Sequence, residues 1–414
     1  MIRATITSTI DQALLSALNF GLAAILIHFA TKPEFGLYSQ LMNLQSFFSP
    51  FHYGIFCSAY LSLASKMESP RQLSYRTAMA HAELGMTIGS SLLVIAACAV
   101  VARAFWPTVT LNMSFAFGIA LLGLWWREFV RQMRFAVLRY GNALKLDVIY
   151  VSITVLAASY LLVDSRVSTT SVLWCMALGG VASAAPPLVS AIRAFPVSPS
   201  AVRQDVFFSW NIGRWEVLSS VVSWTYAQSY VYFAALQGGL DAAAEISAAR
   251  LLAMPLSLLW TSYANVLRPS ASRLIATGTN LDIRRLVLRS ALFVIASSLV
   301  YALLIYAALP LLEHSLFAGK FRNLWSLTIW WVAYFMLTGI TTVASSVLRS
   351  ALEFRQVFYR QALSCVAAVV LLTIGLRLNA IESLVIALVI VEFISAGLFW
   401  HRLSTTVSLR HKSA

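Results

Sequence analysis

Residues 287–312 read VLRSALFVIASSLVYALLIYAALPLL, a run whose one charged side chain is Arg289. A transmembrane helix needs about 20 mostly apolar residues, so this stretch predicts a helix that crosses a membrane. The rest of the 414-residue chain has the same character, with 59% hydrophobic and 11% charged residues. Soluble globular domains carry about 25% charged residues, because charge covers their surface. The composition therefore predicts one polytopic membrane protein and argues against a water-soluble fold.

Further segments along the chain satisfy the same criteria of length and apolarity. Together the twelve predicted spans are residues 10–31, 36–64, 78–102, 110–130, 146–164, 170–192, 212–236, 242–266, 287–312, 325–347, 361–378 and 382–402. Every loop between them is short, and none is long enough to fold into a domain. We therefore predict an all-α integral membrane protein with twelve transmembrane helices, whose function is located among those helices.

The Lys and Arg residues are distributed unequally between alternate loops. One set of loops, together with both termini, holds 22 of the 30, and the other set holds six. Cytoplasmic loops are enriched in Lys and Arg, so both termini are predicted to be cytoplasmic. This orientation signal accounts for the net charge of +14, and no nucleic-acid partner is expected.

Residues 193–206, RAFPVSPSAVRQDV, form the one Pro- and Ser-rich connection in the chain. This connection predicts two domains, residues 1–198 and 199–414, with six spans each. An offset of 205 residues places Pro50 of the second span on Pro255 of the eighth. The match is typical of transporters that are built from two structural repeats. Both prolines are expected to kink their helices at matching depths.

Arg250 is predicted to lie near the middle of the eighth span, about 13 Å from its start at 1.5 Å per residue. Ionisable residues inside spans are costly and usually face an interior cavity. At about 100° per residue, Ser257 and Thr261 share the helix face of this arginine. We interpret this face as one wall of a polar cavity with a cation at its centre. The alternative is a structural ion pair with Glu245 or Glu392.

Other polar side chains align on the faces of predicted spans. Arg214 and Gln228 share a face of the seventh span. Gln12 and Asn19 share a face of the first span, and Gln45 of the second span is the repeat equivalent of the central arginine. Each is a candidate substrate contact. The alternatives are hydrogen bonds between helices and, for Arg214, an anchor at the membrane interface.

Three acidic residues lie in or beside predicted spans: Asp11 in the first, Glu83 in the third and Glu392 in the twelfth. A carboxylate in a medium of low dielectric can carry a proton, so these are candidates for ion coupling. The competing interpretation is a structural partner for an arginine. The four cysteines lack the spacing of metal ligands, and the motifs GxGxxG, GxxxxGK[ST], HExxH and GxSxG are absent. We expect no catalytic residue, metal or cofactor.

Two stretches resemble a known family. The first is DQALLSALNF at residues 11–20, followed by PEFGLY at 33–38. The second is SAARLL at 247–252, which continues through Pro255 to LRP at 267–269. Both resemble bacterial Wzx-type O-antigen flippases, which are polysaccharide-biosynthesis proteins of the multidrug/oligosaccharidyl-lipid/polysaccharide exporter (MOP) superfamily. The span count and the division into six and six agree with that family.

The resemblance implies two six-helix bundles of MATE-like architecture around a central cavity with alternating access. It implies a location in the bacterial inner membrane among membrane lipids. The implied substrate is an undecaprenyl-pyrophosphate-linked oligosaccharide for O-antigen or lipopolysaccharide biosynthesis. Arg250 and Arg214 would bind the pyrophosphate, and neutral polar side chains would meet the sugar. Those side chains are Gln12, Asn19, Gln45, Gln228, Ser257 and Thr261. Ion antiport and contacts with polysaccharide polymerase machinery are further expectations.

Three other classes of protein are weighed against this interpretation. A multidrug or ion antiporter of the same superfamily usually needs acidic groups at its centre to hold cationic drugs, which disfavours it here. An O-antigen polymerase or ligase needs a substantial extracytoplasmic loop for its catalytic groups, and the predicted loops are too short. A structural membrane subunit does not explain a charged, hydroxyl-lined face in the middle of a span. We therefore predict a transporter and not an enzyme.

Overall fold

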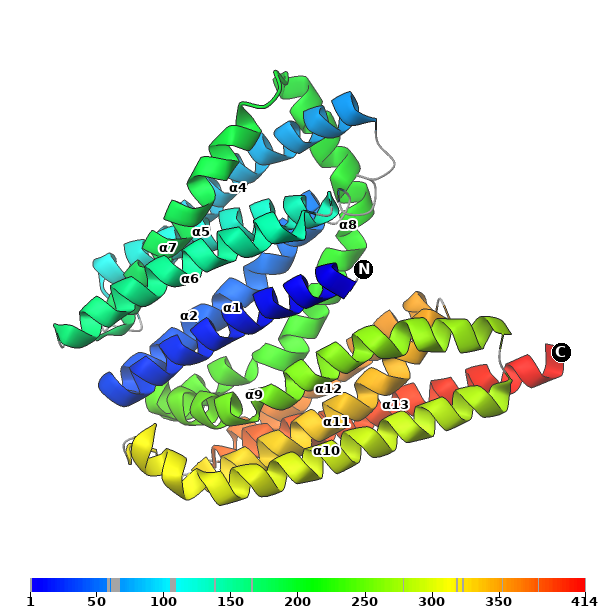
Figure 1. Cartoon of the computed structure of the whole chain (residues 1–414). Coiled ribbons are helices and arrows are strands. Elements are labelled where there is room, and N and C mark those ends of the chain that lie inside the picture. The colour runs from blue at the N-terminus through cyan, green and yellow to red at the C-terminus, as the bar shows by residue number, and fades with distance from the viewer. Residues whose placement is uncertain are drawn as a thin grey trace. The chain divides into compact units, whose positions relative to one another are not determined.

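The computed structural model describes residues 2–57, 60, 68–104, 109–137, 139–164, 167–277, 279–317, 319–321, 324–351, 353–378 and 380–413. Within these residues every regular element is a helix (Figure 1). The elements are α1 (Ile2–Phe29), α2 (Lys32–His52), the π-helical turn η1 (Tyr53–Cys57), α4 (Ser69–Ala104), α5 (Leu111–Ala136), α6 (Tyr140–Val163), α7 (Thr169–Ile192), α8 (Pro199–Gln228), α9 (Tyr230–Thr277), α10 (Asn280–Ser315), α11 (Leu324–Ser350), α12 (Phe354–Leu376) and α13 (Glu382–Ser413). The all-α fold class predicted from composition is confirmed.

Ten stretches of the described helices are long and apolar enough to cross a membrane. The apolar run at 287–312 lies inside α10, as predicted. The predicted span 36–64 begins in α2 and passes into η1 after Pro50, and residues 58–59 and 61–67 lie outside the described part of the chain. α5 continues to Ala136, six residues beyond the predicted end of its span.

Large apolar side chains are exposed along the described helices. Leu303 and Leu311 of α10 are 70% and 71% exposed, and Leu156 of α6 is 71% exposed. Exposed apolar area on this scale is not expected in a soluble monomer and is suited to contact with lipid chains. These faces therefore agree with a membrane location.

Two glycines interrupt the helical backbone between the seventh and eighth predicted spans. Gly238 and Gly239 have non-helical dihedral angles inside α9, and Gly239 has a φ of 70° with a ψ of −163°. Glycine populates this region readily, whereas other residues are strained there. The break falls within residues 237–241, where a tight loop is predicted.

The chain divides into two compact units, Met1–Val221 and Val222–Ala414, and each is described by itself. The division lies inside α8, whereas the sequence places a domain boundary before that helix, at residues 198 and 199. Contacts at the start of α8 explain its place in the first unit. Arg71 of α4 donates to Asp205 at 3.1 Å, and the hydroxyl groups of Tyr75 and Ser209 are hydrogen-bonded.

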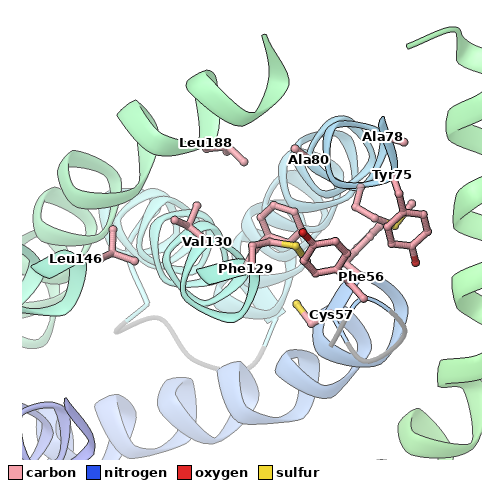
Figure 2. Close-up of a cluster of buried hydrophobic side chains, with 12 residues drawn as sticks. Phe56, Cys57, Tyr75, Ala78, Ala80, Phe129, Val130, Leu146 and Leu188 are labelled. Atoms are coloured by element: carbon pink, nitrogen blue, oxygen red, sulfur yellow. The ribbon is translucent and has the colours of Figure 1, made fainter. Parts of the chain in front are cut away.

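A buried apolar cluster fills one end of the first unit. Figure 2 shows Phe56 of η1 among the central side chains, between Phe129 of α5 and Tyr75 of α4, with Leu146 of α6 and Leu188 of α7 at the periphery. The cluster unites four helices and the π-helical turn. It therefore holds in place the stretch of α5 in which Arg127 and Arg131 flank Phe129 and Val130.

α5 and α7 approach each other at two glycines, Gly123 and Gly180. A Cβ atom on Gly123 would lie 2.7 Å from the backbone nitrogen of Val181, and one on Gly180 would lie 2.9 Å from the backbone carbonyl carbon of Gly123. Small residues allow transmembrane helices to pack backbone against backbone in this way.

Candidate functional site

Arg250 is half-buried on α9, in the second unit, and three aromatic rings surround its guanidinium group. Its guanidinium carbon lies 5.6 Å from the ring centroid of Tyr230, 5.7 Å from that of Trp331 and 5.9 Å from that of Phe335. The rings are 1%, 0% and 3% exposed. We call these three residues the aromatic cage. Each cation–π contact is worth about 0.5–2 kcal/mol, so the cage holds the cation in place.

Two indole groups hold the cage together. Trp331 of α11 donates its Nε1–H to the carbonyl oxygen of Ile246 on α9 at 3.0 Å. Trp260 of α9 donates in the opposite sense, to the carbonyl oxygen of Phe335 on α11 at 2.9 Å. Because the two bonds run both ways between α9 and α11, the rings keep a fixed register against Arg250.

The cage supplies no negative charge to the arginine. In the part of the chain that the structure describes, no carboxylate forms an ion pair with Arg250, and its Nε atom is buried without a hydrogen-bond partner. Glu392, one of the carboxylates considered as its partner, accepts a hydrogen bond from Thr341 at 3.1 Å and interacts with Tyr226. No carboxylate of the described residues therefore neutralises the guanidinium group, and its positive charge can attract an anion.

The other predicted contacts in the second unit have local partners or none. Ser257 donates to the carbonyl oxygen of Met254 at 2.7 Å, and Thr261 donates to that of Ser257 at 2.9 Å. These bonds lie within α9, and each hydroxyl oxygen can still accept a hydrogen bond. The Oε1 atom of Gln228 is buried and lacks a partner among the described residues.

The remaining predicted substrate contacts belong to the first unit. Gln12 and Asn19 are exposed on α1, and Arg214 is exposed on α8. Gln45 on α2 donates to Ser49 at 2.8 Å. Because the two units are described separately, a shared site formed by these residues and Arg250 remains a prediction.

A buried charge network joins α1, α5 and α6 in the first unit. Asp11 is 1% exposed and Asp147 is 0% exposed. Arg127 forms an ion pair with Asp147, and Arg131 contacts Asp11, Asp147 and Glu128. The guanidinium carbon of Arg127 also lies over the ring of Tyr150, 4.5 Å from its centroid. Arg131 is expected in the loop after the predicted span 110–130, whereas α5 continues to Ala136 and keeps it inside the unit.

One nitrogen of this network faces two carboxylates. The Nε atom of Arg131 lies 3.0 Å from Oδ2 of Asp11 and 3.2 Å from Oδ2 of Asp147. Like charges this close repel each other, and the guanidinium group of Arg131 lies against both. Three carboxylates and two guanidinium groups take part in these contacts, so acidic side chains outnumber basic ones.

Glu83 forms a second buried contact that spacing alone did not reveal. Its Oε1 atom lies 3.3 Å from Nδ1 of His52, at the end of α2. The His52 ring stacks on Trp125 of α5, with centroids 4.1 Å apart. Among the described residues, the ion-pair partner of Glu83 is thus a histidine and not an arginine. Among the described residues no group of three His, Cys, Asp or Glu side chains is arranged to hold a metal ion.

The fold is similar to that of solved transporter structures. No family model matches the sequence, and no curated protein is significantly similar to it. An inward-facing MATE family transporter of the MOP superfamily is similar over 99% of both chains, with a TM-score of 0.80 and 12% identity. An outward-facing one has a TM-score of 0.68 and 11% identity, and the match covers 100% of this chain and 96% of the other.

A third solved structure belongs to a MOP superfamily transporter from Pyrococcus furiosus, with a TM-score of 0.61, 10% identity and coverage of 98% and 93% of the two chains. The class is therefore defined by architecture: the chain has the helical fold of MATE transporters. At 10–12% identity this likeness is one of fold.

Proposed function

We propose that this chain is a flippase of the bacterial inner membrane that moves an undecaprenyl-pyrophosphate-linked oligosaccharide from the inner to the outer leaflet by alternating access. The observation that carries the proposal is Arg250, which the aromatic cage holds without an ion-paired carboxylate. A half-buried guanidinium group whose charge no described carboxylate neutralises suits a pyrophosphate, because its planar fork binds phosphate oxygens through charge-assisted hydrogen bonds.

The sugar and the lipid tail make different demands. Hydroxyl groups of a glycan need neutral hydrogen-bond formers, and we assign this role to Gln12, Asn19, Gln45, Ser257 and Thr261. Gln228 belongs to the same set, and its buried unpaired oxygen is a ready acceptor. Arg214 is proposed as the second cation for the pyrophosphate. The polyprenyl tail stays among the membrane lipids, and delivery to polysaccharide polymerase machinery follows on the outer side.

Ion antiport is proposed as the energy source. Asp11 in the charge network, Glu83 beside His52 and Glu392 beside Thr341 are the carboxylates proposed to carry the coupled ion. Asp11 is the carboxylate best supported in this role, because it and Asp147 lie against the same N–H donor of Arg131.

A multidrug antiporter of the same superfamily is the second candidate. The one observation that favours it is the excess of carboxylates in the network around Asp11, since acidic groups suit a cationic drug. The aromatic cage opposes it, because Arg250 repels such a drug. The MOP transporter from Pyrococcus furiosus is described as having a binding pocket of reverse polarity that suggests a different function for that protein. A change of pocket charge is therefore within the range of this fold.

The test is translocation of the lipid-linked oligosaccharide in inverted membrane vesicles. Arg250→Ala and Arg250→Gln are expected to lower the rate at least tenfold, since a charge-assisted hydrogen bond is worth about 1.5–3 kcal/mol. Arg250→Lys keeps the charge and is expected to retain part of the rate. Arg377→Gln, at an exposed position after α12, is the matched control. Wild-type rates in both Ala and Gln variants would remove the assignment, and export of a cationic dye by the wild type would favour the drug antiporter.

A further inference from the structure

A cavity of about 300 Å³ lies in the first unit, apart from the residues assigned to transport. Its lining comes from the start of α4, the end of α5, the start of α6 and the end of α7, so it lies at one end of the bundle. Arg76, Arg134 and Arg139 contribute three positive charges to the lining, and none of the lining residues is acidic. The volume is at the lower end of the range for small-ligand pockets, about 300–1,000 Å³.

Two of these arginines keep donors available. The Nε atom of Arg76 is buried and has no hydrogen-bond partner among the described residues. Arg139 is exposed at the mouth of the cavity, where α6 begins. Arg134 is partly engaged, because it donates to the carbonyl oxygen of Asn142 at 2.5 Å. Asp147, which interacts electrostatically with Arg134, already forms an ion pair with Arg127.

Apolar side chains make up much of the remaining lining. Phe129, Val130 and Met133 of α5 line the cavity, and all three belong to the buried cluster, where Figure 2 shows Phe129 and Val130. Pro187 of α7 adds a further apolar surface. A ligand that contacts both the arginines and the apolar lining residues has an anionic group joined to hydrocarbon.

The position in the membrane narrows the choice of ligand. The cavity is formed by helix ends whose arginines belong to the loop set predicted to be cytoplasmic. Basic pockets between transmembrane helices on that side bind the headgroups of anionic lipids, which are concentrated in the cytoplasmic leaflet. Inorganic phosphate has no hydrocarbon part that could pack against the apolar lining residues.

We propose that this cavity is a binding site for the phosphate headgroup of an anionic glycerophospholipid, with Arg76 and Arg139 as its principal ligands. None of its lining residues is among those assigned to transport, so the proposal does not depend on the transported substrate. A bound lipid joins four helices at the end of the bundle where their charges repel one another, so it stabilises the first unit.

The experiment measures Tm and retained lipid, by native mass spectrometry, of the full chain in detergent. Phosphatidylglycerol is expected to raise Tm by about 2–5 °C at saturation and to remain bound. Phosphatidylethanolamine, whose net charge is zero, and inorganic phosphate are expected to do neither. An equal effect of phosphatidylethanolamine would overturn the charge selectivity, and an equal effect of inorganic phosphate would overturn the lipid assignment.

The variants locate the site. Arg76→Gln combined with Arg139→Gln is expected to abolish the response to phosphatidylglycerol, whereas Arg203→Gln, an exposed residue of α8 outside the lining, keeps it. Ser190→Trp fills the cavity mouth with all three arginines intact and is also expected to abolish it. A full response in either the double variant or Ser190→Trp would overturn the proposal. Transport is not measured, so the result does not depend on the proposed function.

Discussion

Arg131 of α5 donates to Asp11 of α1 across 3.0 Å, and both side chains are almost fully enclosed by the first unit. The same nitrogen reaches Asp147 of α6, so one guanidinium group joins three helices. An ion pair in a dry environment is held strongly because its separated charges would have no water to solvate them. The network therefore contributes both to the assembly of the unit and to the candidate site for ion coupling.

Removal of one carboxylate from this network is expected to be costly. Asp147→Ala leaves Arg127 and part of Arg131 uncompensated, which is expected to lower the free energy of unfolding by about 3–5 kcal/mol. Denaturant unfolding in detergent measures the change. Asp282→Ala removes a carboxylate from the exposed start of α10 and serves as the control, with a much smaller expected loss. Equal losses in the two variants would contradict the role of the network.

The same network gives a prediction about energy coupling. In vesicles with an imposed pH gradient, wild-type translocation is expected to follow the gradient, because Asp11 and Asp147 lie against one guanidinium nitrogen and are the carboxylates proposed to carry the coupled ion. Asp11→Asn fixes that position in a neutral state, so the response is expected to be lost while slow, gradient-independent transport remains. A wild-type rate that ignores the pH gradient, with Asp11→Asn unchanged, would exclude this carboxylate pair as the coupling site.

A further prediction concerns Trp331, which contributes both a ring and a hydrogen bond to the aromatic cage. Trp331→Leu is expected to lower the translocation rate about tenfold, because Arg250 loses its strongest ring contact and its fixed position. Trp400→Leu is the matched control, since Trp400 donates a similar indole hydrogen bond to Ile340 at 3.2 Å and is outside the cage. If both variants lose transport equally, stability and not the cage explains the loss.

The close approach of α5 and α7 is tested by adding single methyl groups. Gly123→Ala places a Cβ 2.7 Å from the backbone of α7, so the free energy of unfolding is expected to fall by about 1–3 kcal/mol. Gly21→Ala on α1 is the control, because no atom lies within 4 Å of the added carbon. A stable Gly123→Ala protein would mean that the two helices separate easily.

Sequence patterns predicted the helices well because each span is a local property of about 20 residues. The run at 287–312 and the break at Gly238 and Gly239 needed no information from elsewhere in the chain. The end of α5 was predicted too early for a physical reason. In the sequence a charged residue such as Arg131 favours a loop. Only tertiary packing brings Asp11 and Asp147 into contact with it.

The candidate site shows the same division. The helix position of Arg250 follows from spacing along one span, but its cage depends on α11, 80 residues further along the chain. No local pattern indicates that Trp331 and Phe335 face α9 and not lipid. The cavity beside Arg76 and Arg139 was missed for a similar reason, because the four helix ends that form it are separated by long apolar spans.

The contact between Gly123 and Gly180 limits how the first unit can deform. If α5 moved along α7 by one helical turn, Ile119 or Arg127 would replace Gly123, and a bulky side chain would collide with the neighbouring backbone. Sliding is therefore blocked in both directions, and the two helices must travel as a rigid pair. Any rearrangement that accompanies transport has to take place by tilting this pair as a whole or by bending helices outside it.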